Sequence, residues 1–231
     1  MTTSPTSAAG RIILAVDVPD ADTAMRMLEP LTGRLRWAKI GLQLFVAEGP
    51  EIVKKVRKAG FEIFLDLKFH DIPNTVRGAI RSARELGVGM TTIHLAGGPA
   101  MVEAAVEEAG DLLVLGVTVL TSMDDAQLAA TGILKSPQEQ VLSLARSGQA
   151  LGLRGVVASP MEIQALRAAC GGELQIVTPG IRPPGKESGD QSRVASPASA
   201  IAAGADYLVI GRPITSAPNP ADAFEAIVNS I

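Results

Sequence analysis

Short β-branched runs alternate strictly with longer helical stretches along this chain, and this alternation limits its possible folds more than any other feature. We expect eight strands, at Arg11–Asp17, Leu35–Gly41, Phe61–Leu67, Met90–Leu95, Leu112–Val119, Gly155–Ala158, Leu174–Thr178 and Tyr207–Gly211. Eight segments rich in Ala, Leu, Glu and Arg are expected as helices, at Asp20–Leu31, Glu48–Ala59, Thr75–Leu86, Pro99–Ala109, Pro137–Leu151, Pro160–Ala169, Pro197–Ala203 and Pro220–Ile231. Such alternation predicts a parallel sheet with right-handed crossovers. Eight units suggest closure into a (β/α)8 TIM barrel, although an open doubly wound sheet would give a similar pattern.

The length and composition agree with one barrel domain. A barrel of this kind uses roughly 200 to 250 residues as one unit, and this chain has 231. Hydrophobic residues make up 47% and aromatic residues only 3%, so the core is expected to consist mainly of Val, Ile, Leu and Ala, as in parallel strands covered on both faces. We therefore predict a flexible N-terminal tail at residues 1–10 and a (β/α)8 barrel catalytic domain at residues 11–231.

Charge, cysteine content and hydropathy argue against several classes of protein. The net charge is −3 and no run rich in Lys and Arg stands out, so no nucleic-acid partner is expected. The lone cysteine, Cys170, cannot form an intrachain disulfide or a multi-Cys metal site. Met1–Gly10 lacks the features of a secretory signal, and the longest apolar stretch, Leu112–Leu120, is too short to cross a bilayer. We therefore predict a cytoplasmic protein without a membrane partner.

Functional groups gather where the predicted strands end. The active site of a TIM barrel lies at the C-terminal ends of its strands, and charged residues inside apolar strand runs are costly unless they are paired. The candidates at these ends are Asp17, Lys39, Asp66, Lys68, His94, Thr121, Ser122, Arg182, Gly211 and Arg212. A single Asp or Lys at a strand end is more often a solvated rim residue, but the combination indicates a site.

The densest segment is Phe64–Thr75, in which Asp66 and Lys68 are two residues apart on a strand and therefore share one face. A carboxylate next to an ammonium group keeps both charged at neutral pH. If Lys39 reaches the same place from the neighbouring strand, an alternating row of Lys, Asp and Lys results. Asp71 lies beyond the strand end, where it could serve the site of a partner across a dimer interface.

Gly211 and Arg212 are interpreted as a phosphate site because of their position at the end of the eighth strand. A glycine there lets a ligand approach the backbone N–H groups, and the Arg212 guanidinium adds a charge-assisted contact. The segment Pro179–Ser196 is long and aperiodic, which is typical of a lid or a binding loop. Arg182, in this segment, could close over the same phosphate.

The two histidines and the cysteine are weaker candidates. His94 could equally be a structural histidine or a site residue. His70 is interpreted as structural or as a supporting residue, and Cys170 as an incidental thiol.

The segment Asp66-Leu-Lys68-Phe-His-Asp71-Ile-Pro-Asn-Thr75 resembles the signature of the orotidine 5'-monophosphate decarboxylase family in its bacterial form. Supporting segments occur in the family's order and span nearly the whole chain beyond the tail: Leu14-Ala-Val-Asp17, Lys39-Ile-Gly-Leu, Val117-Thr-Val-Leu-Thr-Ser122, Val177-Thr-Pro-Gly-Ile-Arg182-Pro, Gly189-Asp-Gln191 and Val209-Ile-Gly-Arg212-Pro. The ten-residue signature is specific, whereas Ile-Gly-Arg-Pro alone is not.

The resemblance implies a reaction and a catalytic group. The family converts orotidine 5'-monophosphate to UMP and CO2 in de novo pyrimidine biosynthesis, as a homodimer, without a metal or an organic cofactor. Its charged tetrad would be Lys39, Asp66, Lys68 and Asp71, with Lys68 as proton donor to C6. Asp71 would come from the second subunit, and Ile72 and Thr75 would accompany it.

The resemblance also implies how the substrate is bound. Asp17 and Lys39 would bind ribose hydroxyls. Thr121 or Ser122 would contact the pyrimidine, and Thr121 is favoured. The phosphate would be held by Gln191, Gly211 and Arg212, with Arg182 assisting.

Two other functions stay open. Mg²⁺-dependent decarboxylases and aldolases of the same barrel superfamily share an Asp-x-Lys-x-x-Asp pattern. They resemble this chain less, because they place an acidic metal ligand near the end of the second strand, where this sequence has Lys39. The other alternative is a catalytically silent phosphate-binding barrel, against which the complete set of charged residues argues.

Overall fold

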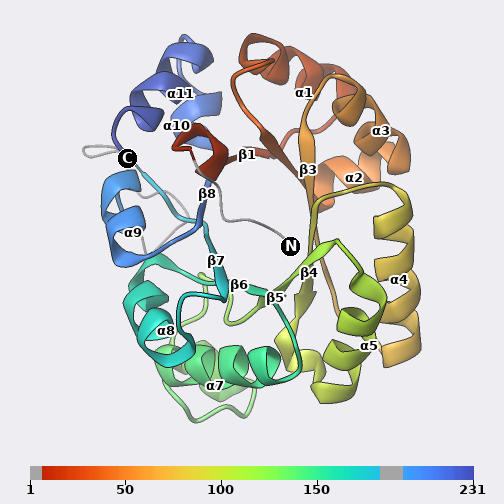
Figure 1. Cartoon of the computed structure of the whole chain (residues 1–231), viewed down its shortest axis with the longest axis vertical. Helices are drawn as coiled ribbons and strands as arrows, with labels where there is room; N and C mark the ends of the chain where they lie inside the picture. The colour runs from red at the N-terminus through yellow and green to blue at the C-terminus, as the bar shows by residue number, and fades with distance from the viewer. Residues whose placement is uncertain (1–6, 183–194) are drawn as a thin grey trace.

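The computed structural model describes residues 7–182 and 195–231, in which eight parallel strands close into a barrel in sequence order, with β1 paired to β8 (Figure 1). The strands are β1 (Ile12–Val16), β2 (Trp37–Gly41), β3 (Glu62–Phe69), β4 (Met90–His94), β5 (Leu113–Val117), β6 (Gly155–Val157), β7 (Gln175–Thr178) and β8 (Tyr207–Ile210). Helices surround this barrel on its outside. The predicted TIM barrel is therefore confirmed, and an open doubly wound sheet is excluded.

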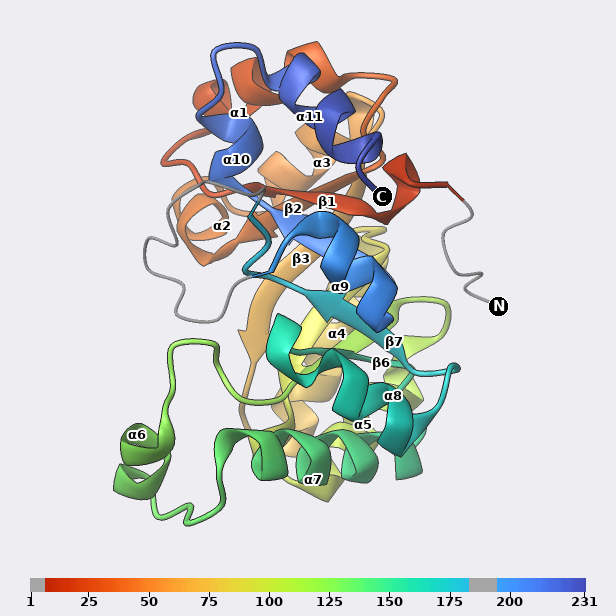
Figure 2. The same ribbon diagram turned by 90° about the vertical axis from the view of Figure 1, so that its left-hand side faces the viewer.

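The helices include all eight of the predicted stretches and three short ones that were not predicted. The helices are α1 (Ala21–Leu28), α2 (Leu42–Glu48), α3 (Pro50–Lys58), α4 (Pro73–Glu85), α5 (Pro99–Ala109), α6 (Asp125–Ala130), α7 (Pro137–Ala150), α8 (Ile163–Cys170), α9 (Pro197–Ala203), α10 (Arg212–Thr215) and α11 (Pro220–Val228). The unpredicted ones are α2, α6 and α10. Figure 2 shows α6 standing away from the barrel body, before the long helix α7.

Helix ends follow ordinary capping rules, and two predicted helices include a short 3-10 turn, Glu29–Leu31 after α1 and Pro160–Glu162 before α8. Asp20 caps α1 by accepting a hydrogen bond from the Thr23 N–H, and Ser136 forms a capping box with Glu139 at the start of α7. The predicted helix Asp20–Leu31 is divided into α1 and a short 3-10 turn at Glu29–Leu31, where Pro30 lacks the N–H that an α-helix would need.

The predicted N-terminal tail falls partly outside the described residues, which begin at residue 7. Ala9–Arg11 form a turn of 3-10 helix before β1, and Gly10 is buried. Flexibility of residues 1–10 stays a prediction.

Two layers of buried side chains fill the molecule, because successive strand residues face opposite sides. On β1, Ile12, Leu14 and Val16 pack in the layer between strands and helices. Ile13 and Ala15 instead join a smaller cluster inside the barrel. Most of both clusters is aliphatic, as the composition predicted.

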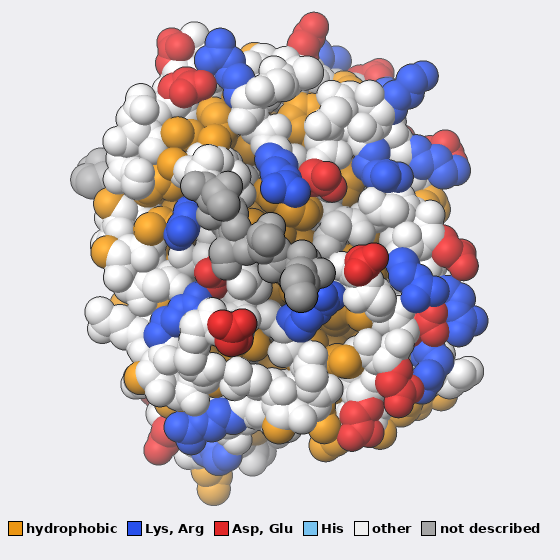
Figure 3. Space-filling view, in the orientation of Figure 1, with side chains coloured by type: hydrophobic (Ala, Val, Ile, Leu, Met, Phe, Trp, Pro, Cys, Tyr) orange, Lys and Arg blue, Asp and Glu red, His pale blue; other side chains and the backbone are white. Residues whose placement is uncertain are grey.

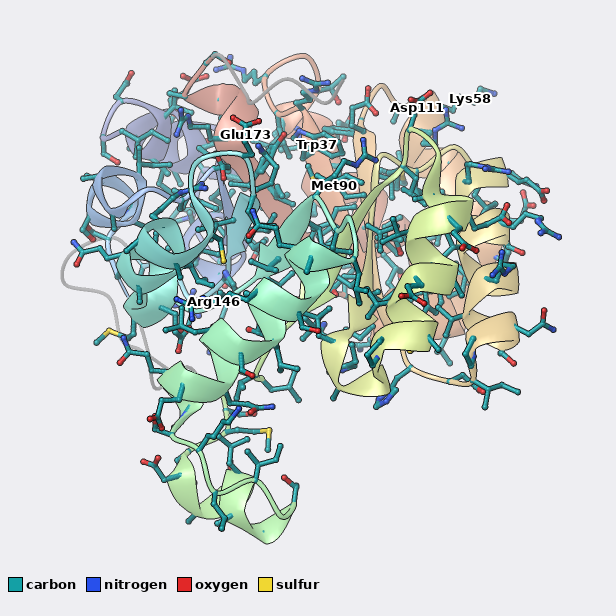
Figure 4. All side chains as sticks on the ribbon, turned by 60° about the horizontal axis from the view of Figure 1, so that its bottom comes forward. Trp37, Lys58, Met90, Asp111, Arg146 and Glu173 are labelled. Atoms are coloured by element: carbon teal, nitrogen blue, oxygen red, sulfur yellow. The ribbon has the colours of Figure 1, made fainter. Side chains whose placement is uncertain are left out.

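Aromatic side chains close the end of the barrel from which the strands begin. Trp37 lies edge-on to Tyr207, with ring centroids 6.2 Å apart, and both belong to the inner cluster together with Met90. Figure 4 shows Trp37 and Met90 at this end of the barrel. Gly89 makes room for the indole, since a Cβ at that position would lie 2.7 Å from the Trp37 ring. The open end is therefore the opposite one.

The pairing of β3 with β4 is irregular at the residues of the predicted signature. Leu65 pairs with Thr91 and Phe69 with Ile93, so four steps along β3 match only two steps along β4. Within this bulge Lys68 has a φ of 52°, a left-handed conformation that is uncommon for a residue other than glycine.

Charged side chains of both signs are interspersed on the end of the molecule shown in Figure 3, among the residues drawn in colour there. This distribution fits the net charge of −3. No helix in the described ranges is both long enough and apolar enough to span a bilayer.

Candidate active site

A cavity of about 540 Å³ opens at the C-terminal ends of the strands, the face on which TIM-barrel active sites lie. Its size is that of a typical small-molecule site. Eight of the predicted site residues line it: Asp17, Lys39, Asp66, Lys68, Thr121, Arg182, Gly211 and Arg212. Ser122 is not among the residues that line it, so the geometry favours Thr121 of the two candidates for the pyrimidine contact.

The predicted alternating row of charges is present. Lys68 Nζ lies 2.8 Å from Asp66 Oδ1, and Lys39 Nζ lies 3.5 Å from Asp66 Oδ2. Lys39 Nζ is also 3.0 Å from Asp17 Oδ1. The row thus runs from Asp17 through Lys39 and Asp66 to Lys68, along three adjacent strands.

Burial makes the middle of this row unusual. The side chains of Lys39 and Asp66 are only 10% and 13% exposed, whereas that of Asp17 is 60% exposed. Burial by itself raises the pKa of Asp66. The positive charges of Lys39 and Lys68, with hydrogen bonds from Lys68 and Thr92, outweigh burial and leave the pKa below its usual value. Asp66 is therefore ionised at neutral pH.

Gly41, at the end of β2, leaves space for this row. A Cβ at that position would lie 3.0 Å from Asp17 Oδ1 and 3.1 Å from Lys39 Nζ. Each atom would have to shift by a few tenths of an ångström beside an added methyl group, so the glycine leaves room for the ion pair in this geometry.

Thr92, on β4, contacts two residues of this row and was missed by the sequence analysis. Its side chain is fully buried. The hydroxyl accepts a hydrogen bond from the Lys68 N–H at 2.9 Å and donates one to Asp66 Oδ1 at 3.0 Å. A Thr in an apolar strand carries little signal by itself. Its inward position two residues before His94, at the C-terminal end of β4, was the available clue.

The phosphate end of the predicted site lies in the same cavity at the end of β8, the strand that pairs with β1. Gly211 follows β8 directly and Arg212 begins α10. Arg182 lines the same cavity, and its backbone N–H donates to the carbonyl of Ala195 at 2.9 Å. Residues 183–194, which include Gln191 and most of the predicted lid, lie outside the described residues.

Three predicted residues lie away from the cavity of their own chain. Asp71, Ile72 and Thr75 are exposed and are not among the residues that line it. The Asp71 carboxylate accepts a hydrogen bond from the backbone N–H of Ile72 at 2.6 Å. Ile72 is 67% exposed, which is unusual for a large aliphatic side chain.

His94 lies beside this site without lining the cavity. Its ring centroid is 5.5 Å from that of His70. Burial lowers the pKa of His94, electrostatic interactions with His70 and Lys68 lower it further, and the interaction with Asp66 opposes them. His94 is therefore neutral at pH 7. Neither histidine lines the cavity, and a role for either of them stays a prediction.

The structure also places the potential metal-ligating side chains and the lone cysteine. Within residues 7–182 and 195–231, no three His, Cys, Asp or Glu side chains are grouped so as to hold a metal ion. Cys170 is buried at the end of α8, and burial raises the pKa of its thiol, so a reactive role is disfavoured.

Comparison with known proteins identifies a family. The model of the "Orotidine 5'-phosphate decarboxylase / HUMPS family" matches residues 10–227. An orotidine 5'-phosphate decarboxylase of Pasteurella multocida is 48% identical over 226 residues, which cover 96% of this chain and 97% of that protein. One from Moorella thermoacetica is 49% identical over 231 residues, covering 96% and 92%.

Solved structures give the same result. A crystal structure of orotidine 5'-phosphate decarboxylase from Lactobacillus acidophilus superposes with a TM-score of 0.85 at 36% identity, covering 95% of this chain and 97% of that one. An uncharacterized conserved protein from Geobacillus kaustophilus also has a TM-score of 0.85, at 33% identity, with coverage of 95% and 99%.

Proposed function

Since this chain belongs to the orotidine 5'-phosphate decarboxylase / HUMPS family, we propose that it converts orotidine 5'-monophosphate to UMP and CO2 in de novo pyrimidine biosynthesis. The observation that carries this proposal is the row Lys39–Asp66–Lys68 in the wall of a cavity that also contains Gly211 and Arg212. One cavity thus offers a charged end for the reacting base and a cationic end for a phosphate.

The charged row suits a reaction in which a carbanion forms. When the bond from C6 to the carboxylate breaks, CO2 leaves and the electron pair stays on C6. The ammonium group of Lys68 stabilises that charge and then donates a proton to C6, which gives UMP. Lys68 regains a proton from solvent after release of the products. Asp66 holds the Lys68 ammonium in place through the 2.8 Å contact.

The rest of the cavity binds the nucleotide in this proposal. Asp17 and Lys39 hold ribose hydroxyls, and Thr121 contacts the pyrimidine. Gly211 and Arg212 hold the phosphate, with Arg182 and Gln191 assisting. Phosphate binding far from C6 contributes energy that organises the reacting end.

We further propose a homodimer that completes each site. Asp71, Ile72 and Thr75 are exposed and do not line the cavity of their own chain, and an exposed Ile72 fits burial against a second subunit. In the dimer these three residues enter the partner's cavity, where Asp71 becomes the fourth member of the charged row.

The reaction is proposed to need no metal and no organic cofactor, since a protonated lysine supplies the electrostatic stabilisation. The test is to mix the purified protein with orotidine 5'-monophosphate in EDTA and to follow the loss of ultraviolet absorbance. Full activity is expected. Activity abolished by EDTA and restored by Mg²⁺ would favour the metal-dependent superfamily relatives instead. A cytoplasmic location also remains a prediction.

A substitution of Lys68 separates catalysis from binding. Lys68→Ala should abolish turnover while UMP still binds, because the phosphate contacts lie elsewhere in the cavity. Lys58→Ala is the matched control, because Lys58 ends α3 on the exposed surface near the closed end of the barrel (Figure 4), and it should turn over like the unmodified protein. Unchanged turnover in Lys68→Ala would refute its assigned role. Absence of turnover in the unmodified protein would favour a silent phosphate-binding barrel.

A further inference from the structure

The bulge in β3 raises the question of what holds Lys68 in its conformation. A φ of 52° places this residue in the left-handed region, which costs a residue with a Cβ roughly 1–2 kcal/mol. The bulge also leaves two extra residues of β3 without a regular partner on β4. A buried backbone N–H needs a hydrogen-bond acceptor. Since regular pairing with β4 is interrupted here, a side chain has to supply the acceptor for the Lys68 N–H.

Thr92 provides that acceptor from the facing strand. Its hydroxyl accepts from the Lys68 N–H at 2.9 Å, and the same hydroxyl donates its hydrogen to Asp66 Oδ1 at 3.0 Å. One oxygen atom therefore connects the backbone of Lys68 to the carboxylate of Asp66. Because Thr92 is fully buried, its hydroxyl cannot bond to solvent in place of these two partners.

We propose that Thr92 is a positioning residue for the decarboxylation: its hydroxyl fixes the Lys68 backbone and the Asp66 carboxylate together, and so sets where the Lys68 ammonium lies. This inference rests on the proposed function. Thr92 does not line the cavity, so it acts through Asp66 and Lys68. Asp66 Oδ1 receives hydrogen bonds from both Lys68 Nζ and Thr92 Oγ1, which restrict its rotation.

The preceding residue is a matched control. Thr91 is also a threonine of β4 and is equally buried. It faces the other side of the strand, where its hydroxyl donates to the carbonyl of Leu65 at 2.9 Å. The two hydroxyls thus belong to the same residue type on one strand at the same burial, and only that of Thr92 contacts Asp66 and Lys68.

The experiment compares Thr92→Val, Thr92→Ser and Thr91→Val. Single-turnover rates with orotidine 5'-monophosphate report the chemical step, and titration with UMP reports binding. Thr92→Val removes a hydrogen bond to a charged group, so its rate should fall about 10- to 100-fold, while its UMP affinity stays within about threefold. Thr92→Ser keeps the hydroxyl and should restore the rate to within about threefold. Thr91→Val should keep it within about twofold.

Two results would overturn the proposal: a Thr92→Val rate within about twofold of the unmodified protein, or an equal loss in Thr91→Val. If Thr92→Val does not fold, Thr92→Ser and Thr92→Ala replace it, since both lack the methyl group and only Ala lacks the hydroxyl. Equal rates in that pair would also overturn it.

A crystal structure of Thr92→Val separates this inference from the proposed function. The Lys68 φ and the distance from Lys68 Nζ to Asp66 Oδ1 should both change, whether or not the protein acts on this substrate. Unchanged geometry would refute the positioning role. An unmodified protein that fails to decarboxylate orotidine 5'-monophosphate would refute the function alone.

Discussion

Asp66 lies between two lysine ammonium groups, and an Asp66→Asn substitution tests whether this arrangement stabilises the folded chain. The amide has the shape of the carboxylate without its charge. Its oxygen can still accept hydrogen bonds from Lys68 and Thr92. Its NH2 group then occupies the place of Oδ2 and faces Lys39 Nζ, which was 3.5 Å from a carboxylate oxygen. The attraction between Lys39 Nζ and a carboxylate oxygen is thus replaced by a contact between two hydrogen-bond donors.

The expected loss is large because the pair is buried. Removing one partner of a buried ion pair costs about 3–5 kcal/mol, and Asp66 and Lys39 are only 13% and 10% exposed. A chain of this size loses roughly 2–4 °C in Tm for each kcal/mol. The Tm of Asp66→Asn should therefore be lower by about 6–20 °C.

Asp17→Asn is the matched control for this measurement. It makes the same chemical change on a carboxylate that also contacts Lys39, but at 60% exposure. A pair of that kind contributes less than about 1 kcal/mol. Thermal unfolding should be followed at one fixed protein concentration without nucleotide, because dimerisation and ligands both shift Tm. An Asp66→Asn Tm at or above that of the unmodified protein would refute the reasoning, as would equal losses in the two variants.

Three further predictions concern other parts of the structure. Gly41→Ala should lower turnover at least about tenfold, because its methyl group would lie 3.0 Å from a carboxylate oxygen and 3.1 Å from an ammonium nitrogen of the cavity. Gly172→Ala, which meets nothing within 4 Å, should leave turnover unchanged, and equal effects would contradict the crowding explanation. Since burial lowers the pKa of His94 below 6.5 in the folded chain, the unfolded chain binds more protons just below pH 6.5. The free energy of unfolding, measured with urea, should fall as the pH falls through that window, and His94→Gln should reduce the fall; an identical pH profile would count against it. Arg167→Ala should lower the free energy of unfolding by about 2–4 kcal/mol, because it leaves a partly buried Asp206 and the carbonyls of Gly204 and Leu174 without this partner; a loss below about 1 kcal/mol would show that water replaces it.

Much of the fold could be predicted from the sequence, because the period of hydrophobic residues and the residues typical of turns mark helices and strands locally. Two of the helices that were missed, α2 and α10, lack those signals. In α2, Leu42 and Val46 are 55% and 81% exposed, so apolar residues do not mark a buried face there. The helix α10 has four residues and follows Gly211 directly, too short for any periodic pattern.

In the site, local sequence signals predicted some features and failed to predict others. Strand period correctly placed Asp66 and Lys68 on one side, and the pair with Lys39 formed as expected. The bulge at Lys68 could not be predicted, because it depends on a hydroxyl of Thr92 that lies 24 residues further along the chain. Pairing between strands, and not propensity within one strand, determines that conformation.

The aromatic contact at the closed end of the barrel also provides an optical probe. The chain has one tryptophan and one tyrosine, and their rings meet edge to face from β2 and β8, with β1 between these strands. Their contact therefore spans the seam where the first strand meets the last. Indole emission at this position reports whether the seam is closed, with energy transfer from the single phenol as a second signal. Because the pair lies at the end opposite the cavity, fluorescence can follow folding of the barrel separately from events in the site.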